Sequence, residues 1–198
     1  MMTNAGLQHA HRVVSSESEE LILVDETDNQ VGFSSKADCH DGDGVLHRAF
    51  SLFLFNDEGE LLLQQRSAAK RLWPGYWSNS ICSHPRRGES MAEATQRRLL
   101  DELNLESELE YVYKFAYQAR FGDAGSENEL CHVFLGHVPS EVRPNDNEIA
   151  AVRFVSPAEL DKEFLERPET LTPWFRMEWQ SLNAEYRDRL AKYARLAA

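Results

Sequence analysis

The stretch SHPRRGESMAEATQRRLLDELNL, residues 83–105, combines a turn with the start of a helix. Within it, Ser90-Met-Ala-Glu93 is a capping box, in which the serine and glutamate side chains accept backbone N–H groups that lack partners at the start of a helix. We expect this helix to run through Leu103. Residues three and four positions apart share a helix face, so the buried face is expected to contain Ala92, Thr95, Leu99 and Leu103.

Strand patterns lie on both sides of this helix. Before it, we expect strands at Leu21–Val24, Ala49–Phe55 and Glu60–Gln65, with Asn56-Asp-Glu-Gly59 as the turn of a hairpin between the last two. After it, strands are expected at Val112–Ala119, Leu130–His137 and Val152–Val155. Ser156 and Pro157 have the pattern of a helix start. After Pro173, a C-terminal helix is predicted by the spacing of Leu182, Tyr186, Leu190, Tyr193 and Leu196.

The length and composition predict one folded domain. The chain has 198 residues, of which 42% are hydrophobic, and we expect a flexible leader at 1–19 and a single domain at 20–198. A net charge of -12 argues against a nucleic-acid partner. Apolar runs are too short to span a membrane, and the leader lacks the apolar centre of an export signal. Three scattered cysteines favour a reducing compartment, so a cytoplasmic protein is expected.

The same stretch, 83–105, resembles the Nudix box, G-x5-E-x7-R-E-U-x-E-E-x-G-U. Counted from Ser83, the matching residues are Glu89, Arg97, Leu99, Asp101, Glu102 and Leu105. The departures are Ser83 and Asn104 in place of glycine, Asp101 in place of glutamate, and Arg98 in place of the glutamate that follows Arg97. An arginine cannot ligate a cation, so Nudix-type hydrolysis is not expected. The alternative is an ordinary charged surface, on which Arg98 and Glu102 form a solvated pair worth ~0.3–0.5 kcal/mol.

Two adjoining motifs are more specific. Trp73-Pro-Gly-Tyr-Trp77 is followed by Ser78-Asn-Ser-Ile-Cys-Ser-His-Pro85. Together they resemble the type I isopentenyl-diphosphate isomerases, a branch of the Nudix superfamily, and the resemblance extends from Leu21 to Trp174. It implies an α+β fold: a Nudix-type mixed-sheet α/β/α sandwich with an additional N-terminal strand and C-terminal helix. It also implies interconversion of isopentenyl and dimethylallyl diphosphate by protonation and deprotonation, in isoprenoid biosynthesis.

Two pairs of potential ligands and catalytic groups occur at i,i+2. In an extended segment Cys82 and His84 face the same side, as do Glu127 and Glu129. The resemblance implies a five-residue metal site made of His40, His47, His84, Glu127 and Glu129. Such a nitrogen and oxygen donor set suits Mn2+ or Zn2+ better than Mg2+.

The resemblance also implies how a substrate is held and converted. It makes Glu102 the residue that holds Mg2+ on the substrate diphosphate, and it gives the diphosphate a set of cations, Lys36, Arg66, Lys70 and Arg98. Cys82 and Glu129 become the proton-transfer pair, with Tyr117 bonded to the glutamate. Trp174 lies over the hydrocarbon end, where an aromatic face stabilises a carbocation. Our hypothesis is that Glu129 delivers the proton and Cys82 takes one from the adjacent methylene. The alternative for Trp174 is simple core packing.

The remaining arginines, cysteines and histidines are expected to lie outside the site. We expect Arg71, Arg86 and Arg87 to be surface charges, Cys39 and Cys131 to be packing thiols, and no site role for His9, His11, His132 and His137. The first rival function is a Nudix diphosphate hydrolase. The second is a non-catalytic binding module stabilised by zinc, with Cys82, His84, His40 and His47 as its ligands. The expected partner is a small isoprenoid diphosphate, and a monomer is favoured.

Overall fold

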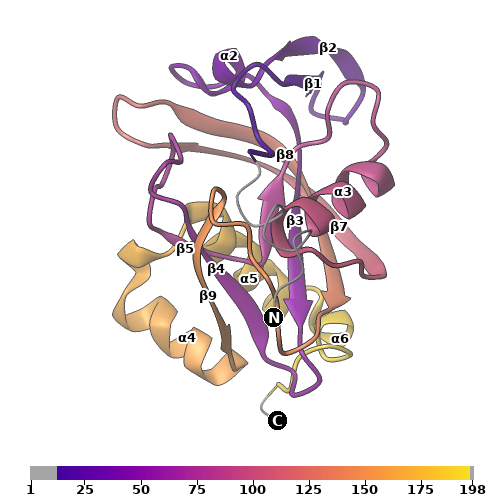
Figure 1. Ribbon diagram of the computed structural model, residues 1–198, viewed down its shortest axis with the longest axis vertical. Coiled ribbons are helices and arrows are strands. Elements are labelled where there is room, and N and C mark those ends of the chain that lie inside the picture. Colours follow the sequence, from indigo (N-terminus) through magenta and orange to yellow (C-terminus); the bar gives the residue numbers. More distant parts are fainter. Residues whose placement is uncertain (1–12, 197–198) are drawn as a thin grey trace, which may run out of the picture.

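Helices cover both faces of one mixed sheet (Figure 1). The computed structural model describes residues 13–196, in which nine strands are found. The strands are β1 (Glu20–Val24), β2 (Gln30–Ser35), β3 (His47–Phe55), β4 (Leu61–Arg66), β5 (Trp77–Ser78), β6 (Ile81–Ser83), β7 (Leu109–Arg120), β8 (Ser126–His137) and β9 (Ile149–Val155). The helices are α2 (Lys36–His40), α3 (Met91–Leu103), α4 (Pro157–Glu166), α5 (Pro173–Ala184) and α6 (Arg187–Leu190), with a 3-10 turn at Pro168–Thr170.

Strand β3 is the centre of the sheet. It pairs antiparallel with β1, β4 and β6, and it pairs parallel with β8 from His47↔Glu129 to Phe55↔His137. Alternate side chains of a strand point to opposite faces. Accordingly, Phe53 and Phe55 enter one hydrophobic cluster, while Leu52 and Leu54 enter another. A strand that is covered on both faces becomes apolar throughout, which accounts for the unbroken run Ala49–Phe55.

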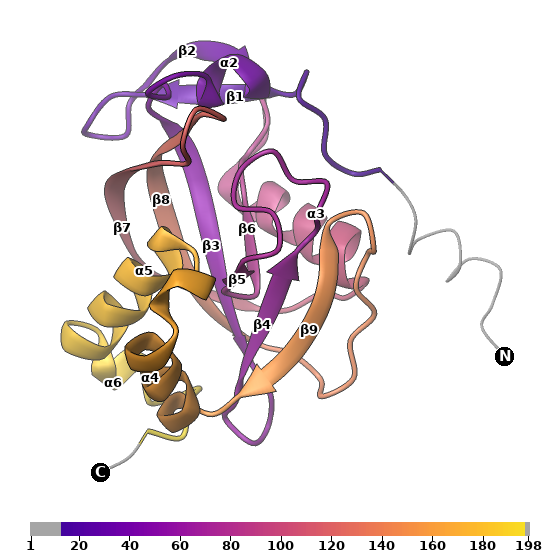
Figure 2. The ribbon, with the colours of Figure 1, turned by 90° about the vertical axis from the view of Figure 1, so that its left-hand side faces the viewer.

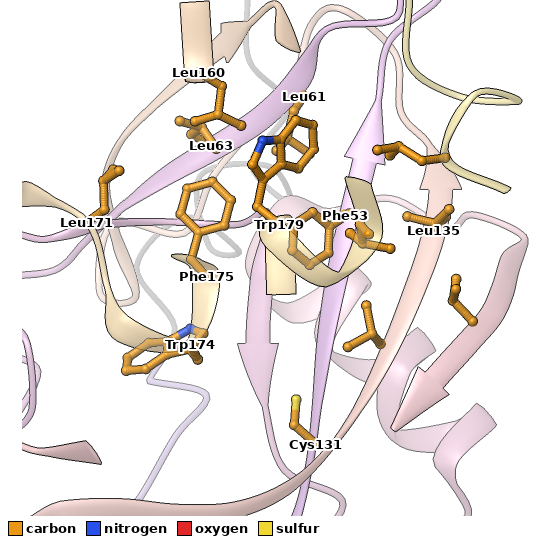
Figure 3. Close-up of a cluster of buried hydrophobic side chains, with 14 of the residues drawn as sticks. Phe53, Leu61, Leu63, Cys131, Leu135, Leu160, Leu171, Trp174, Phe175 and Trp179 are labelled. Atoms are coloured by element: carbon orange, nitrogen blue, oxygen red, sulfur yellow. The ribbon is translucent and has the colours of Figure 1, made fainter. Parts of the chain in front are cut away.

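The two clusters define the layers. Helix α3 packs on one face of the sheet, while α4, α5 and α6 lie on the other (Figure 2). Figure 3 shows the second layer, in which Phe175 and Trp179 of α5 pack against Phe53 and Leu61 of the sheet. This arrangement confirms the expected α/β/α sandwich.

Both predicted helix caps are present, but three local predictions needed correction. Ser90 and Ser156 each form a complete capping box. On α3, however, Ala92 is exposed and Ala94 is buried, so the buried face is rotated from the expected one. The expected hairpin pairs only at Phe55↔Leu61. Along the rest of their lengths, β3 pairs with β6 and β8, whereas β4 pairs with β5 and β9. The two strands therefore belong to different parts of the sheet.

The third correction concerns the C-terminal helix, which is broken in two. Helix α5 ends at Ala184 and α6 begins at Arg187, because Tyr186 leaves the helical conformation with φ -122° and ψ 26°. Its ring stacks on Tyr113 of β7 with centroids 4.6 Å apart. Leu182 and Leu190 still reach the core, as their spacing predicted.

The segment 13–19, part of the expected leader, lies against the domain. Val14 is 5% exposed, and its carbonyl accepts hydrogen bonds from Arg86 and Arg98. The remainder of that leader, with His9 and His11, lies outside the described residues. Between residues 13 and 196, no helix is both long and apolar enough to cross a lipid bilayer.

Candidate functional site

A cavity of about 280 Å³ opens where the first turn of α5, the ends of β4, β6 and β8, and the segment 13–17 meet. Many of the residues singled out from the sequence line it. They are Lys36, His40, Arg66, Lys70, Cys82, His84, Arg98, Tyr117, Glu127, Glu129 and Trp174. The lining also includes residues without a predicted role, namely Val13, Ser15, Glu17, Ala69, Arg71, Leu72, Ser83, Asn147 and Glu148.

The five expected metal ligands form one cluster, and all of them except the fully buried His47 line the cavity. One potential ligand atom from each of His40, His47, His84, Glu127 and Glu129 lies within 4.8 Å of every other. The topology explains this meeting, because the parallel register places His47 beside Glu129, and alternation along β8 places Glu127 on the same face. His84 directly follows β6, which pairs with β3, and His40 ends the short helix α2.

The charges and contacts of this cluster fit a divalent metal ion. His47 Nδ1 lies 2.7 Å from the carbonyl of Val45, which turns its Nε2 toward the cluster. His40 Nε2 lies 2.9 Å from Glu127 Oε2, and the buried His47 Nε2 makes no hydrogen bond with the described residues. Burial, together with the neighbouring His40, lowers the pKa of His47 to about 4, and the pKa of His84 also falls well below 6.5. Neutral imidazole is the form that binds a metal.

The thiol of Cys82 is held by polar groups on several sides. Its Sγ donates to Asn79 Oδ1 at 2.8 Å, and the Asn79 amide is fixed by bonds from its Nδ2 to two backbone carbonyls. Trp174 Nε1 donates to the sulfur at 3.1 Å, and the hydroxyls of Ser78 and Ser51 lie 3.5 and 3.8 Å from it. Burial raises the pKa of Cys82 to about 12. The group is therefore a neutral thiol at rest, with donors in place to stabilise a thiolate.

Glu129 faces two environments at once. Its Oε1 lies 2.7 Å from His84 Nε2 and 3.8 Å from His47 Nε2, while its Oε2 accepts a hydrogen bond of 2.6 Å from the hydroxyl of Tyr117. Tyr117 and Glu129 are register partners on β7 and β8. Burial and the charge of Glu127 raise the pKa of Glu129 well above 4.5. One oxygen is thus available to a metal and the other to a proton.

Trp174 forms an aromatic wall of the cavity. It is the second residue of α5, is 2% exposed, and lies 6.2 Å from the Tyr117 ring between centroids. The ring of Trp73 supports it edge-on at 5.2 Å. The guanidinium of Arg66 lies 5.2 Å from the centroid of the Trp174 ring. Trp174 therefore contributes both to the core and to the cavity.

The four expected phosphate-binding cations line the cavity. Arg66 donates to the backbone carbonyls of Leu72 and Trp73. Lys36 Nζ donates to Ser15 Oγ at 2.7 Å. Lys70 and Arg98 share a counter-ion that sequence reasoning missed, since the carboxylate of Glu148 pairs with both. Burial opposes ionisation of Glu148, but the charges of Lys70 and Arg98 outweigh it and lower its pKa to about 2.

Comparison with known proteins agrees with this geometry. A model of the NUDIX domain matches residues 45–175. A crystal structure of a protein from Deinococcus radiodurans aligns with a TM-score of 0.65 over 89% of this chain and 100% of that one; at 22% identity it shows the fold alone. Isopentenyl-diphosphate Delta-isomerase 1 of Photorhabdus laumondii is 41% identical over 174 residues, which cover 87% of this chain and 99% of that protein. The isopentenyl-diphosphate Delta-isomerase of Serratia proteamaculans is also 41% identical, over 91% of this chain and 98% of that protein.

This chain belongs to the isopentenyl-diphosphate Delta-isomerase family. The structure explains why its Nudix box departs from the consensus at Arg98. Arg98 and Glu102 are not a solvated surface pair: both side chains are 3% exposed and 2.6 Å apart. Glu102 lies behind Arg98 rather than among the residues that line the cavity. Where a hydrolase would place a carboxylate, this isomerase-family chain places a buried cation.

Several contributors to the site had no signal in the sequence. Glu148 follows a loop of polar residues, and Ser51 lies within an apolar strand. Arg71 is exposed, as expected of a surface charge, but it also lines the cavity, and its guanidinium is held by Asp41 and by two backbone carbonyls. Arg87 is at the surface as expected, with its side chain 58% exposed. Glu178 lies one helical turn after Trp174 and is buried on the same helix, α5. That spacing indicates only that the two side chains share a helix face.

We expect Arg98→Met to lower the free energy of unfolding by about 3–5 kcal/mol, because removing one partner of a buried charge pair leaves the other uncompensated. The affected partners are Glu102 and Glu148. Urea denaturation followed by circular dichroism measures the change. Lys162→Met is the control, because its pair with Glu166 is exposed and should change stability by less than about 0.5 kcal/mol. Equal effects of the two substitutions would contradict the buried-pair interpretation.

Proposed function

We propose that this chain interconverts isopentenyl diphosphate and dimethylallyl diphosphate by moving a proton between two carbons. The observation that carries the proposal is that Cys82 and Glu129, 47 positions apart in sequence, line the same cavity. Trp174 contacts the Cys82 sulfur, and Tyr117 contacts the Glu129 carboxylate. The family names of the relatives at 41% identity support the same reaction.

The diphosphate would occupy the basic part of the cavity. Arg66, Lys70, Arg98 and Lys36 supply four positive charges there, and guanidinium groups can bind phosphate oxygens with two donors each. A diphosphate would compete with Glu148 for Lys70 and Arg98. We assign Glu102 to a Mg2+ ion carried by the substrate, a role that requires Arg98 to turn to the diphosphate and release the Glu102 carboxylate.

The five-residue cluster would hold Mn2+ or Zn2+. Three imidazoles and two carboxylates are a nitrogen and oxygen donor set typical of these ions. When bound, such an ion supplies positive charge that offsets the paired carboxylates and fixes the position of Glu129. Cys82 is not part of this cluster in the described chain, which separates the proposal from a zinc module that uses its thiolate.

The proton balance of the reaction needs only two groups of the chain. Glu129 donates a proton to the terminal methylene carbon of isopentenyl diphosphate, and the neighbouring carbon becomes a tertiary carbocation. Cys82 first gives its resting proton to solvent and, as thiolate, removes a proton from the adjacent methylene, which forms the new double bond. Between turnovers Cys82 releases that proton and Glu129 takes one up, so both groups return to their starting forms. The reverse reaction exchanges the two roles. Burial of Glu129 favours its protonated form, and Trp174 and Ser51 donate hydrogen bonds to the thiolate.

The surroundings of the alkene protect the cation. Trp174 and Tyr117 present aromatic rings, and cation–π attraction contributes ~0.5–2 kcal/mol or more in a desolvated site. Trp73 packs against Trp174, and Phe121 packs on Trp73 with ring centroids 5.1 Å apart. Aromatic rings offer the cation no nucleophile. A reducing compartment such as the cytoplasm would keep Cys82 as the free thiol that this chemistry requires.

The direct test is incubation of the protein with isopentenyl diphosphate, Mg2+ and Mn2+ in D2O, followed by proton NMR. We expect dimethylallyl diphosphate to appear with deuterium in a methyl group, without release of phosphate. Phosphate release from nucleotides without isomerisation would instead favour a Nudix hydrolase. Unfolding on metal removal, with sulfur among the metal ligands by X-ray absorption, would favour a zinc-stabilised module.

A further inference from the structure

The buried carboxyl group of Glu178 has no task in the mechanism above. Glu178 is 0% exposed and lies one helical turn after Trp174, so both side chains of α5 reach the same side of the sheet. The thiol of Cys131 donates to Glu178 Oε1 at 3.4 Å. Glu178 Oε2 makes no hydrogen bond with the described residues. A carboxylate in such surroundings would be poorly solvated, which favours the uncharged acid.

Ser51 connects this carboxyl group with the reacting sulfur. Ser51 is 1% exposed and is the register partner of Cys82 where β3 pairs with β6. Its hydroxyl lies 3.8 Å from Cys82 Sγ and 3.5 Å from Cys131 Sγ, and it also hydrogen bonds with the Glu178 carboxyl. A hydroxyl has one proton to donate. Ser51 can therefore donate to the sulfur or to the carboxylate, but not fully to both.

We propose that Glu178 is a positioning residue that acts on the reaction through Ser51. While Glu178 is uncharged, it can donate to Ser51, and the Ser51 hydroxyl donates to Cys82. Once Glu178 is ionised, it draws the Ser51 hydroxyl to itself, and the Cys82 thiolate loses one of its donors. This inference rests on the proposed function, because it assumes that Cys82 alternates between thiol and thiolate.

The electrostatics give this switch a pH range. Burial raises the pKa of Glu178 to about 8, against the opposing effect of the hydrogen bonds from Ser51 and Cys131. The titratable groups that face it from neighbouring strands are Cys82, Cys131, Glu129 and Tyr113. None of these four is a cation, so none would hold Glu178 ionised at neutral pH. Below about pH 8 the Glu178 carboxyl group is neutral, and the Ser51 hydroxyl donates its hydrogen bond to Cys82. Above about pH 8 the Ser51 hydroxyl donates to the Glu178 carboxylate instead.

The test compares pH profiles of kcat and KM for the full chain and its variants. For the wild type we expect kcat to fall as pH rises through about 8. Glu178→Gln cannot ionise, so it should keep the wild-type rate at pH 7 within about threefold and lose this fall. Ser51→Ala should lower kcat about tenfold at pH 7 without a matching change in KM, because one neutral hydrogen bond to the sulfur is lost. It should be equally insensitive to pH in this range.

Two controls separate this inference from a structural role and from the proposed function itself. Glu185→Gln makes the same chemical change at an exposed position after α5 and should retain the wild-type profile. An unchanged fall near pH 8 in Glu178→Gln, with an active wild type, would overturn the inference alone. A wild type that isomerises nothing at any pH would overturn the proposed function and the inference with it.

Thermal unfolding gives a readout that does not depend on activity. The native state holds the Glu178 proton up to about pH 8, whereas the unfolded chain releases it near 4.5. The native state therefore binds more protons between these values, and stability falls as pH rises. Glu178→Gln lacks this loss of stability. The melting temperature of the variant minus that of the wild type should therefore increase from pH 5 to pH 8. A constant difference across that range would contradict a titrating Glu178.

Discussion

Replacement of Cys82 by alanine is expected to lower kcat for isomerisation by about 10³-fold, with little change in KM. Positioned acids and bases contribute about 10²–10⁴-fold, and Cys82 is the cavity-lining thiol that Trp174 contacts. KM should hold, because Lys36, Arg66 and Lys70, rather than the thiol, would bind the diphosphate. Conversion of isopentenyl diphosphate followed by NMR measures the effect.

Cys39→Ala is the matched control for this prediction. Cys39 is also a free thiol, and it is completely buried in α2 without lining the cavity. We expect it to retain isomerisation within about threefold, with some loss of stability from the smaller side chain. A Cys82→Ala variant that keeps a near-normal rate would remove the thiol from the reaction and would leave Glu129 without its proposed partner.

Local patterns predicted the elements of this fold well because their causes are local. The capping boxes at Ser90 and Ser156 need only residues within one turn of the helix. The burial of Ala94 instead of Ala92 depends on where the sheet lies beneath α3, and the sequence of the helix does not contain that information. The break at Tyr186 has the same origin, since its ring packs on Tyr113, 73 positions earlier.

Site residues that belong to a sequence motif or to one face of a strand could be predicted from the sequence. Cys82 and His84 belong to one motif, and Glu127 and Glu129 to one strand face, so their proximity follows from alternation along a strand. Glu148 and Glu178 could not be found in this way. Each is an isolated carboxylate whose importance comes from its buried neighbours, Lys70 and Arg98 in one case and Ser51 and Cys131 in the other. Such roles arise from tertiary packing alone.

The carboxylates Glu127 and Glu129 permit a second test with a large expected effect. Both belong to the same cluster, both are buried on the same face of β8, and both become neutral when changed to glutamine. Only Glu129 also contacts Tyr117. We expect each substitution to weaken Mn2+ binding at least about tenfold, because each removes one charged ligand. Metal affinity is measured by calorimetry on the metal-free protein.

Saturation with Mn2+ should then separate the two variants. Glu127→Gln has lost only a ligand, so excess metal should restore kcat to within about tenfold of the wild type. Glu129→Gln has also lost the group that carries the proton, so kcat should stay lower by about 10³-fold even when the metal site is filled. Recovery of Glu129→Gln by metal would reduce Glu129 to a ligand. Failure of Glu127→Gln to recover would mean that the charge of the cluster, rather than the Glu129–Tyr117 pair, controls proton transfer.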